Sequence, residues 1–534
     1  MNAPYDFDYV VIGSGFGGSV SACRLTEKGY SVGVMEMGRR WKAEDFPKSS
    51  WDSKRYIWRP GLRMFGFYNM RLFRHMVVMC GNAVGGGSIA YANALLEPKS
   101  SIWEHGSWAG LANWKSVMPA HYATAERMLG VTDNKFLGES DRRLKKMADL
   151  AGVGDTYYTG RMGTFFAPAG EAGGKTYPDP YFGGEGPARG TCVGCGGCML
   201  GCQHNAKNTL DKNYLYFAEK RGAQVFAETK VVDVRPLHRK TDGADGYEVD
   251  VEHATAVFDK QRRSFRCRNL VFAASSLGTV ELLLRLKERG SLPNISDDLG
   301  KRVRTNAEST ICVRFPNSDV SMSQGVAGGA AIYLDDHTHI GVARFPEGSD
   351  AIALMMTLLS GGRAGWRRAL AWMWKMLSNP FMALRAHNPI GFARQTMIFV
   401  VMHTLGDAFV NLRLKRRWFW PFTQLLSTEG QRIPAFIPNA NEFVEKGAKA
   451  LGGIPMGLVT DILFNIPTTA HCIGGCAMAD SPERGVMDVQ NRVFGYQNML
   501  ICDGSMLSAN LGVNPSLTIT ALTEHAMSYI PAKS

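Results

Sequence analysis

A glycine-rich turn near the N-terminus constrains the fold of this chain more than any other feature. The run Gly13-Ser14-Gly15-Phe16-Gly17-Gly18 follows directly on the apolar stretch 9–12, and residues 19–25 after it have the composition of a helix. A second apolar stretch, 31–35, ends at Glu36. Strand, glycine turn, helix, strand and terminal acid together predict the βαβ unit that binds dinucleotides.

Each element of this unit has a physical role. We expect Gly13 to make the tight turn, Gly15 to let a pyrophosphate approach the backbone, and Gly18 to let the helix pack against the strand. The N-terminus of the helix offers unpaired N–H groups to the phosphate charge. Glu36 is placed to accept hydrogen bonds from ribose hydroxyls, which argues against a 2′-phosphate. The alternative is a glycine-rich turn with no ligand.

A second glycine cluster follows at residues 80–88. Three consecutive glycines in it allow the backbone to lie flat against a ligand. We expect a cofactor contact at Gly81, Gly85, Gly86, Gly87 and Ser88.

The length of 534 residues predicts two or three domains. The first strand begins almost at once, so we expect no secretory signal. The sequence has no apolar run of 18 or more residues, so we expect no membrane-spanning helix. Four of the eleven cysteines crowd into 192–202, which favours metal binding or redox work over a disulfide framework. We expect a cytoplasmic protein, with peripheral contact to the inner face of the membrane kept open.

Basic and aromatic residues gather in two stretches. The window Arg363–Arg417 holds ten Lys and Arg residues against the single acid Asp407, with Trp and Phe interleaved as far as Phe422; it supplies +9 of the net charge of +12. Lys54–Arg74 is similar, with six basic residues and no acid. This composition predicts contact with an anionic membrane surface. The alternative is a solvated face over core aromatics, and no motif supports nucleic-acid binding.

Patterning elsewhere predicts further elements. We expect helices at 113–152, 212–221 and from 277 onward, strands at 225–228, 231–234, 270–275 and 499–502, and a long loop over 160–189.

Taken in order, these motifs resemble the glucose–methanol–choline (GMC) oxidoreductase family, in particular its branch of bacterial cholesterol oxidases. The segments that carry the resemblance are 13–18 with Glu36, 84–88, 96–99, 273–279, 471–476, 503–504 and 512–522.

The resemblance implies an α/β fold in which a discontinuous Rossmann-like domain binds FAD rather than NAD, with an inserted antiparallel-sheet substrate domain. The FAD-binding domain would take 1–40, 78–110, 203–310 and 465–534. The substrate domain and membrane-facing excursions would take 41–77, 111–191 and 311–464, with a cysteine loop at 192–202.

The activity implied by the resemblance is oxidation of a hydrophobic, sterol-like alcohol to the carbonyl. A hydride would pass to the flavin, and electrons would leave to O₂, to a carrier or to a quinone. The alternatives are a GMC-like lyase or isomerase with structural FAD, and an electron-transfer flavoprotein without a substrate.

Alcohol oxidation needs a base with a pKa near the working pH, and histidine provides one. By the resemblance, His471 takes or orients the hydroxyl proton, and Asn514 donates a hydrogen bond to the oxygen as charge develops. Asp503, Gly504 and Pro515 would contact FAD.

The chain departs from the family pattern at several points. Ser275 and Tyr91 stand where the family usually has Gly and Asn, with Asn93 displaced by two positions. Residues 363–422 cannot be aligned with the family, and the glutamate described for some sterol oxidases cannot be placed from the sequence.

The cysteine loop has the spacing of a bacterial ferredoxin, Cys192-x₂-Cys195-x₂-Cys198-x₃-Cys202. Gln203 replaces the usual proline, and in two-cluster ferredoxins the fourth cysteine serves the other cluster, so one run need not close a site alone. The spacing predicts a [4Fe–4S] or [3Fe–4S] cluster. The alternatives are structural zinc, which more often uses two well-separated CxxC pairs, and free thiols.

Overall fold

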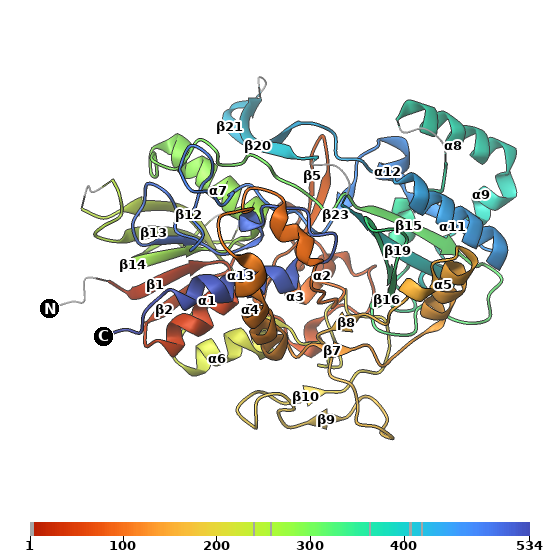
Figure 1. Cartoon of the computed structure of the whole chain (residues 1–534), viewed down its shortest axis with the longest axis horizontal. Helices are drawn as coiled ribbons and strands as arrows, with labels where there is room; N and C mark the ends of the chain where they lie inside the picture. The colour runs from red at the N-terminus through yellow and green to blue at the C-terminus, as the bar shows by residue number, and fades with distance from the viewer. Residues whose placement is uncertain (1–4, 239–240, 257–258, 362–364, 405–407, 418–419) are drawn as a thin grey trace.

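The structure is a computed structural model that describes residues 5–238, 241–256, 259–361, 365–404, 408–417 and 420–534. Two sheets dominate it, one toward each end of the molecule (Figure 1). Both chain termini lie beside the first sheet. The mixture of a largely parallel sheet with crossover helices and a separate antiparallel sheet confirms the expected α/β fold class.

The first sheet has seven strands in the order β11-β2-β1-β14-β13-β12, with β24 paired to β14. Its central strands run parallel to one another and are apolar, as expected for strands with helices on both faces of the sheet. Only the pairs β12–β13 and β13–β14 are antiparallel. The strands are β1 (Phe7–Ile12), β2 (Val32–Met35), β11 (Gln224–Phe226), β12 (Thr229–Pro236), β13 (Tyr247–His253), β14 (Arg263–Phe272) and β24 (Met499–Ile501).

Helices pack on both faces of this sheet. α1 packs against α6 and α13, and α13 packs against α4, while α7 lies above the sheet in Figure 1. The helices are α1 (Phe16–Glu27), α4 (Trp114–Leu129), α6 (Tyr214–Lys220), α7 (Ser275–Arg289) and α13 (Ser516–Ser528).

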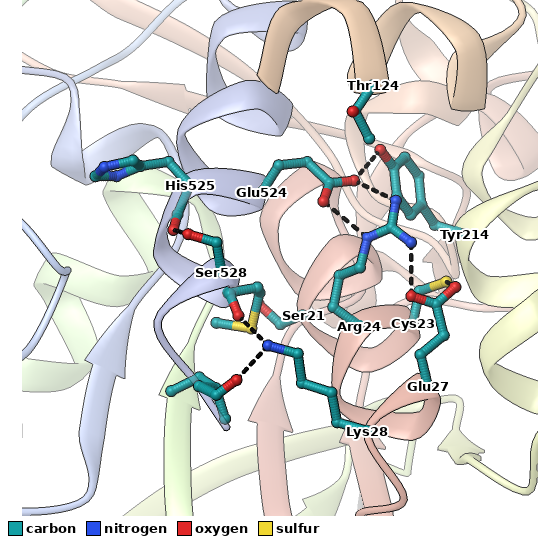
Figure 2. Close-up of polar contacts among 12 residues, drawn as sticks. Ser21, Cys23, Arg24, Glu27, Lys28, Thr124, Tyr214, Glu524, His525 and Ser528 are labelled. Atoms are coloured by element: carbon teal, nitrogen blue, oxygen red, sulfur yellow. Dashed lines mark hydrogen bonds and ion pairs between the residues drawn. The ribbon is translucent and has the colours of Figure 1, made fainter. Parts of the chain in front are cut away.

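A buried polar network holds α13 against the glycine-turn helix α1 (Figure 2). Arg24 of α1 donates to both carboxylate oxygens of Glu524 on α13, at 2.7 and 2.8 Å, and the Tyr214 hydroxyl donates to the same carboxylate at 2.6 Å. Lys28 donates to the carbonyl of Met527 at 2.6 Å. Because these groups are little exposed, the ion pair is weakly screened, and it holds the C-terminal half of α13 against α1.

The second sheet is antiparallel, in the order β16-β17-β19-β15-β22-β18. α5 and α11 cover one face, and residues of α9 and α10 enter the core on the other. The elements are β15 (Ser309–Arg314), β16 (Gly328–Tyr333), β17 (Thr338–Ala343), β18 (Met356–Leu358), β19 (Thr396–His403), β22 (Ile454–Leu458), α5 (Glu139–Leu150), α9 (Pro380–His387), α10 (Phe392–Gln395) and α11 (Pro438–Leu451).

Smaller elements connect the two halves. A hairpin, β20 and β21, packs on α7 and places Val410 and Leu412 in the core of the first sheet. The remaining elements are α2 (Ser53–Tyr56), β3 (Trp58–Arg59), β4 (Met64–Phe65), β5 (Tyr68–Leu72), β6 (Val77–Gly81), α3 (Gly87–Ala90), β7 (Thr132–Asp133), β8 (Arg161–Met162), β9 (Thr176–Tyr177), β10 (Arg189–Gly190), α8 (Trp366–Ser378), β20 (Val410–Arg417), β21 (Trp420–Gly430), α12 (Val459–Leu463) and β23 (Thr468–Thr469).

One predicted helix is wrong in extent. The segment 113–152 forms α4 and α5 rather than one helix, because Gly130 ends α4 in a left-handed conformation with a φ of +60°. The chain then forms β7 before α5 begins. The other helices and strands predicted above are confirmed to within a few residues, except that the strand predicted at 270–275 is β14, which begins at Arg263 and ends at Phe272.

The two basic, aromatic stretches differ in exposure. In 54–74 the larger rings are core residues, with Phe67, Trp58 and Tyr68 buried. α8 and α9 instead project at one corner of the molecule (Figure 1) and expose most of their apolar side chains. Arg363, Asp407 and Trp418 lie outside the described residues. No helix in the described part of the chain is long and apolar enough to cross a membrane.

Candidate active site

The glycine turn has the geometry that each glycine requires. Gly13 has a φ of +102°, and a Cβ on it would lie 2.3 Å from the carbonyl oxygen of Ala273. A Cβ on Gly18 would lie 2.0 Å from the carbonyl oxygen of Gly13, and one on Gly17 would lie 1.7 Å from that of Cys502. These three positions therefore admit only glycine.

Gly15 differs from its neighbours, because a Cβ there would meet nothing within 4 Å. It is the N-cap residue of α1, and no side chain caps the helix. The first N–H groups of α1 therefore face open space, which fits a pyrophosphate and its negative charge.

Glu36 ends β2 beside this turn and is buried. Its carboxylate accepts hydrogen bonds from the backbone N–H of Ser14 at 3.0 Å, from the Ser14 hydroxyl at 2.6 Å and from the N–H of Gly38 at 2.7 Å. Burial raises the pKa of this carboxyl, and the hydrogen bonds act in the opposite direction. A hydrogen bond from Glu36 to a ribose stays a prediction.

The second glycine cluster closes over the first. The N–H of Gly85 donates to the Ser14 hydroxyl at 3.0 Å, and a Cβ on Gly86 would lie 2.6 Å from the Cα of Gly15. Ser88, on α3, donates to the carbonyl of Gly85 at 2.6 Å. Gly87 and Gly81 lie so close that a Cβ on Gly81 would be 2.6 Å from the Gly87 Cα. Two loops far apart in sequence thus form one cradle.

Asp503 follows β24 and ties it to α7. Its carboxylate accepts from the Ser505 N–H at 2.8 Å and from the Thr279 hydroxyl at 2.5 Å. Burial raises the pKa of Asp503, and these hydrogen bonds act in the opposite direction. Gly504 comes next in the chain, and Pro515 is the N-cap residue of α13. β1, β14 and β24 are parallel, so the loops after them meet at one edge of the sheet, where open α/β sheets bind ligands.

His471 and Asn514 are brought together from the two sides of this edge. The His471 Nε2 lies 3.0 Å from the Asn514 amide nitrogen. His471 follows β23, and Asn514 directly precedes the N-cap of α13. The amide of Asn306 donates to the carbonyl of Val513 at 2.8 Å and lies 3.2 Å from the His471 Nδ1, so it joins the two loops.

Glu308 was missed by the sequence analysis. Its carboxylate contacts the His471 Nδ1, and its side chain is 3 % exposed. A carboxylate on Nδ1 orients the ring so that Nδ1 carries its proton toward Glu308 and Nε2 faces Asn514. The only sequence signal was an acid immediately before the buried strand β15, which is too common to single out one residue.

The departures from the family pattern have structural explanations. Ser275 has a φ of +70°, a left-handed conformation that glycine adopts more easily. Tyr91 packs edge-on against Phe16, with ring centroids 5.7 Å apart. Asn93 is fully buried and donates to the Thr164 hydroxyl, so its amide is engaged away from the glycine cradle.

The four clustered cysteines line one cavity of about 110 Å³. All are free thiols, and among the described residues no group of three or more His, Cys, Asp or Glu side chains is placed to hold a metal ion. The N–H groups of Gly194 and Ala206 donate to the sulfurs of Cys192 and Cys202, at 3.4 and 3.3 Å. The structure therefore does not support the predicted site, either as an iron–sulfur cluster or as zinc.

Comparison with known proteins agrees with this geometry. The family model described as GMC oxidoreductase matches residues 431–523. The chain is 65 % identical to a cholesterol oxidase of Acinetobacter baumannii, over 99 % of this chain and 95 % of that protein. It is 41 % identical to a cholesterol oxidase of Mycobacterium tuberculosis, over 99 % and 92 %.

Among solved structures, pyridoxine 4-oxidase from Mesorbium loti has a similar fold, with a TM-score of 0.62 and 13 % identity over 98 % of this chain and 99 % of that one. The full-length identity to two curated relatives decides the family. The chain belongs to the GMC oxidoreductase family and is an FAD-dependent alcohol oxidoreductase.

Proposed function

We propose that this enzyme oxidises the hydroxyl group of a sterol-like alcohol to the carbonyl, with His471 and Asn514 as the groups that contact the reacting oxygen. The observation that carries the proposal is the 3.0 Å pairing of the His471 Nε2 with the Asn514 amide at the ligand-binding edge of the sheet. The substrate class is supported by the similarity to two cholesterol oxidases over nearly the whole chain.

The residues of the two glycine loops would hold the cofactor. When bound, FAD accepts a hydride from the carbon that bears the hydroxyl. The open space in front of Gly15 fits the pyrophosphate, and Glu36 and Asp503 are placed at the ends of β2 and β24 to hold the ribose and ribityl portions. The remaining contacts that we propose are Gly13, Phe16, Gly17, Gly18, Gly81, Gly85, Gly86, Gly87, Ser88, Gly504 and Pro515.

The proton chemistry follows from the hydrogen bonds of His471. Glu308 holds the Nδ1 proton, so Nε2 presents its lone pair and accepts the proton of the substrate hydroxyl. The Asn514 amide then donates to the substrate oxygen as negative charge develops on it. Glu308 stabilises the imidazolium that results, because its carboxylate lies against the newly charged ring.

A cavity of about 600 Å³ lies beside the Asn514 loop and is lined by residues 509–513. Its volume falls within the roughly 300–1,000 Å³ of small-molecule sites. Its walls mix apolar side chains such as Leu511 and Val513 with His105, His337 and His339. We propose that the substrate enters through it.

Anaerobic addition of a 3-hydroxysterol to the purified holoenzyme tests the function. An oxidation bleaches the flavin absorbance in proportion to the carbonyl formed. A lyase or isomerase with structural FAD would form product without bleaching, and an electron-transfer flavoprotein would form no product. Either result contradicts the proposal.

We also propose that the cysteine loop holds an iron–sulfur cluster. A cluster carries its own inorganic core, so its cysteines surround a volume, whereas a single zinc draws its sulfurs to about 2.3 Å from one point. The four sulfurs line a shared cavity of about 110 Å³, which supports the cluster over zinc.

Metal and sulfide analysis of anaerobically purified protein tests the cluster. We expect iron and acid-labile sulfide in the wild type and in Cys267→Ala, a control at a buried cysteine of β14, and their loss in Cys198→Ala. Zinc without iron, or equal iron in both variants, would contradict the cluster.

Finally, we propose that α8 and α9 contact an anionic membrane surface. Trp374 and Phe381 are 73 % and 81 % exposed, and residues 366–387 include four basic residues and no acid. Exposed rings enter the headgroup region while cations meet lipid phosphate.

Sedimentation with vesicles of anionic lipid tests this contact. The double variant Trp374→Ser/Phe381→Ser should lose binding, whereas Leu150→Ser, which removes an exposed apolar residue of α5, should retain it. Absence of wild-type binding at low salt would leave α8 and α9 as a solvated face.

A further inference from the structure

Asn306 is a fully buried side chain that lies between the two residues proposed to contact the substrate oxygen. Its amide nitrogen lies 3.2 Å from the His471 Nδ1. The same nitrogen donates to the carbonyl of Val513 at 2.8 Å, one residue before Asn514. The loop that carries Asn514 is therefore held by a side chain that also touches His471.

The two hydrogen atoms of the Asn306 amide decide which of these contacts is a hydrogen bond. Besides His471, the amide nitrogen has two acceptors, the Val513 carbonyl and the Met402 sulfur, which is 3.5 Å away. When the His471 Nδ1 holds its proton toward Glu308, that nitrogen has no lone pair with which to accept a hydrogen bond. Asn306 thus acts on the position of the Val513 loop rather than on the protonation of His471.

The backbone of Asn306 is fixed to the antiparallel sheet. Its carbonyl accepts from the N–H of His403, the last residue of β19, at 2.9 Å. The carbonyl of His403 in turn accepts from the amide of Asn510 at 2.9 Å. The loop before α13 is therefore held to β19 at two points, through Asn510 and through Val513. The second of these lies next to Asn514 in the chain.

The segment that presents Asn306 has two unfavourable features. Its side-chain oxygen is buried without a hydrogen-bond partner among the described residues. The next residue, Ala307, has a φ of +46°, in the left-handed region that alanine rarely adopts. Reversing the amide would set its oxygen against the Val513 carbonyl. Strained backbone clusters at active sites, and an unpartnered buried polar atom calls for an explanation beyond stability.

We propose that Asn306 is a positioning residue of the oxidation. Its hydrogen bond to the Val513 carbonyl holds the Asn514 amide where it and His471 can both reach the substrate oxygen. This inference rests on the roles proposed above for His471 and Asn514. Reacting groups must be held close to their productive geometry, and a displacement of about 1 Å can slow a reaction about 100-fold. Loss of the hydrogen bond should therefore slow the chemical step and leave substrate binding nearly unchanged.

A double-mutant cycle in the holoenzyme tests this role. Asn306→Ala removes the hydrogen bond, and we expect it to slow anaerobic flavin reduction by a 3-hydroxysterol about 10- to 100-fold. The sterol concentration that gives the half-maximal rate should change less than about threefold, because the positioning acts on the chemical step. In the Asn514→Ala background no amide is left to position, so the same substitution should slow reduction less than about threefold.

Two further variants separate positioning from packing. Asn306→Asp keeps the side-chain volume, but its carboxylate repels the Val513 carbonyl, so the rate should fall at least as far as in Asn306→Ala. A packing role would make the smaller alanine the slower variant. The control Asn441→Ala removes a buried asparagine of α11 that donates to the carbonyl of Ile437 at 2.9 Å, and it should keep the wild-type rate. Hydrogen–deuterium exchange of the backbone at 510–514 should be faster in both Asn306 variants and unchanged in Asn441→Ala.

The outcomes separate this inference from the proposed function. A wild-type reduction rate in Asn514→Ala contradicts the proposed role of Asn514, and the role of Asn306 with it. A slow Asn514→Ala together with a wild-type rate in Asn306→Ala contradicts the inference alone. An equal loss from Asn306→Ala in both backgrounds makes Asn306 a residue of the fold and not of the reaction. Loss of bound FAD in both Asn306 variants but not in Asn441→Ala has the same meaning.

Discussion

The His471 centre and the cysteine centre are built in opposite ways. At the first, each ring nitrogen of His471 already has a partner, Asn514 at Nε2 and Glu308 at Nδ1. At the second, four thiols line a cavity of about 110 Å³, and the Lys207 ammonium group beside them donates to backbone carbonyl oxygens. The polypeptide alone thus orders the first centre, whereas at the second the thiols surround a space rather than pair with named side chains.

Gly15→Val should separate the two centres most completely. A Cβ at this position meets no protein atom within 4 Å, so we expect the fold to persist, while the valine side chain fills the space of the pyrophosphate. We expect loss of all bound FAD with iron unchanged. Absorbance and metal analysis of the same preparation measure both, and full flavin content would contradict the pyrophosphate assignment.

His471→Ala should act on the chemical step alone. Loss of a general base typically costs about 10²–10⁴-fold in rate. Stopped-flow measurement of anaerobic flavin reduction should show this loss with FAD and iron at wild-type levels, while His253→Ala on β13 serves as the control. A wild-type reduction rate would remove His471 from the mechanism.

Glu308→Gln should have a smaller effect, because the amide keeps a hydrogen bond to Nδ1 but no longer stabilises the charged ring. A hydrogen bond to a charged group contributes about 1.5–3 kcal/mol, or roughly 10- to 150-fold in rate. We expect this loss in kcat with little change in KM. Glu308→Asp should recover part of the lost kcat. A rise in KM by the same factor would point to a role in substrate binding instead.

The last prediction concerns acid stability rather than catalysis and defines the pH range for comparing the centres. Burial lowers the pKa of His339 to about 4, so between about pH 4 and 6.5 the unfolded chain binds a proton there that the folded chain does not. The contribution of His339 to the free energy of unfolding is fully present above about pH 6.5. It falls by about 3 kcal/mol in total as the pH falls toward 4.

His339→Gln should flatten this part of the stability curve in urea unfolding. The comparison with wild type isolates His339, because burial raises the pKa of Asp461 to about 8 and gives that group the opposite slope. Parallel curves for the two proteins would contradict the assignment.

What could be predicted from sequence was local. Gly13, Gly15 and Gly18 could be assigned their roles because turn, cap and helix packing depend on neighbours in the chain. The contacts of Glu308 and Lys207 could not be predicted, because the topology brings each of them to a partner more than 100 residues away in the sequence.

Composition alone was also insufficient for the surface. The stretches 54–74 and 366–387 both combine basic and aromatic residues, yet Phe67 is buried and Phe381 is 81 % exposed. The difference arises because the first stretch supplies strands to a small sheet, while the second forms two helices at a corner of the molecule. Burial follows from that placement and not from residue type.

The ion pair between Arg24 and Glu524 has a consequence for biosynthesis (Figure 2). The helix that follows the glycine turn packs on α13, although Arg24 and Glu524 are 500 residues apart in the sequence. Contacts of such long sequence separation form late. The nascent chain therefore carries an incomplete nucleotide site until α13 has been synthesised, because the helix that anchors the first turn is still absent.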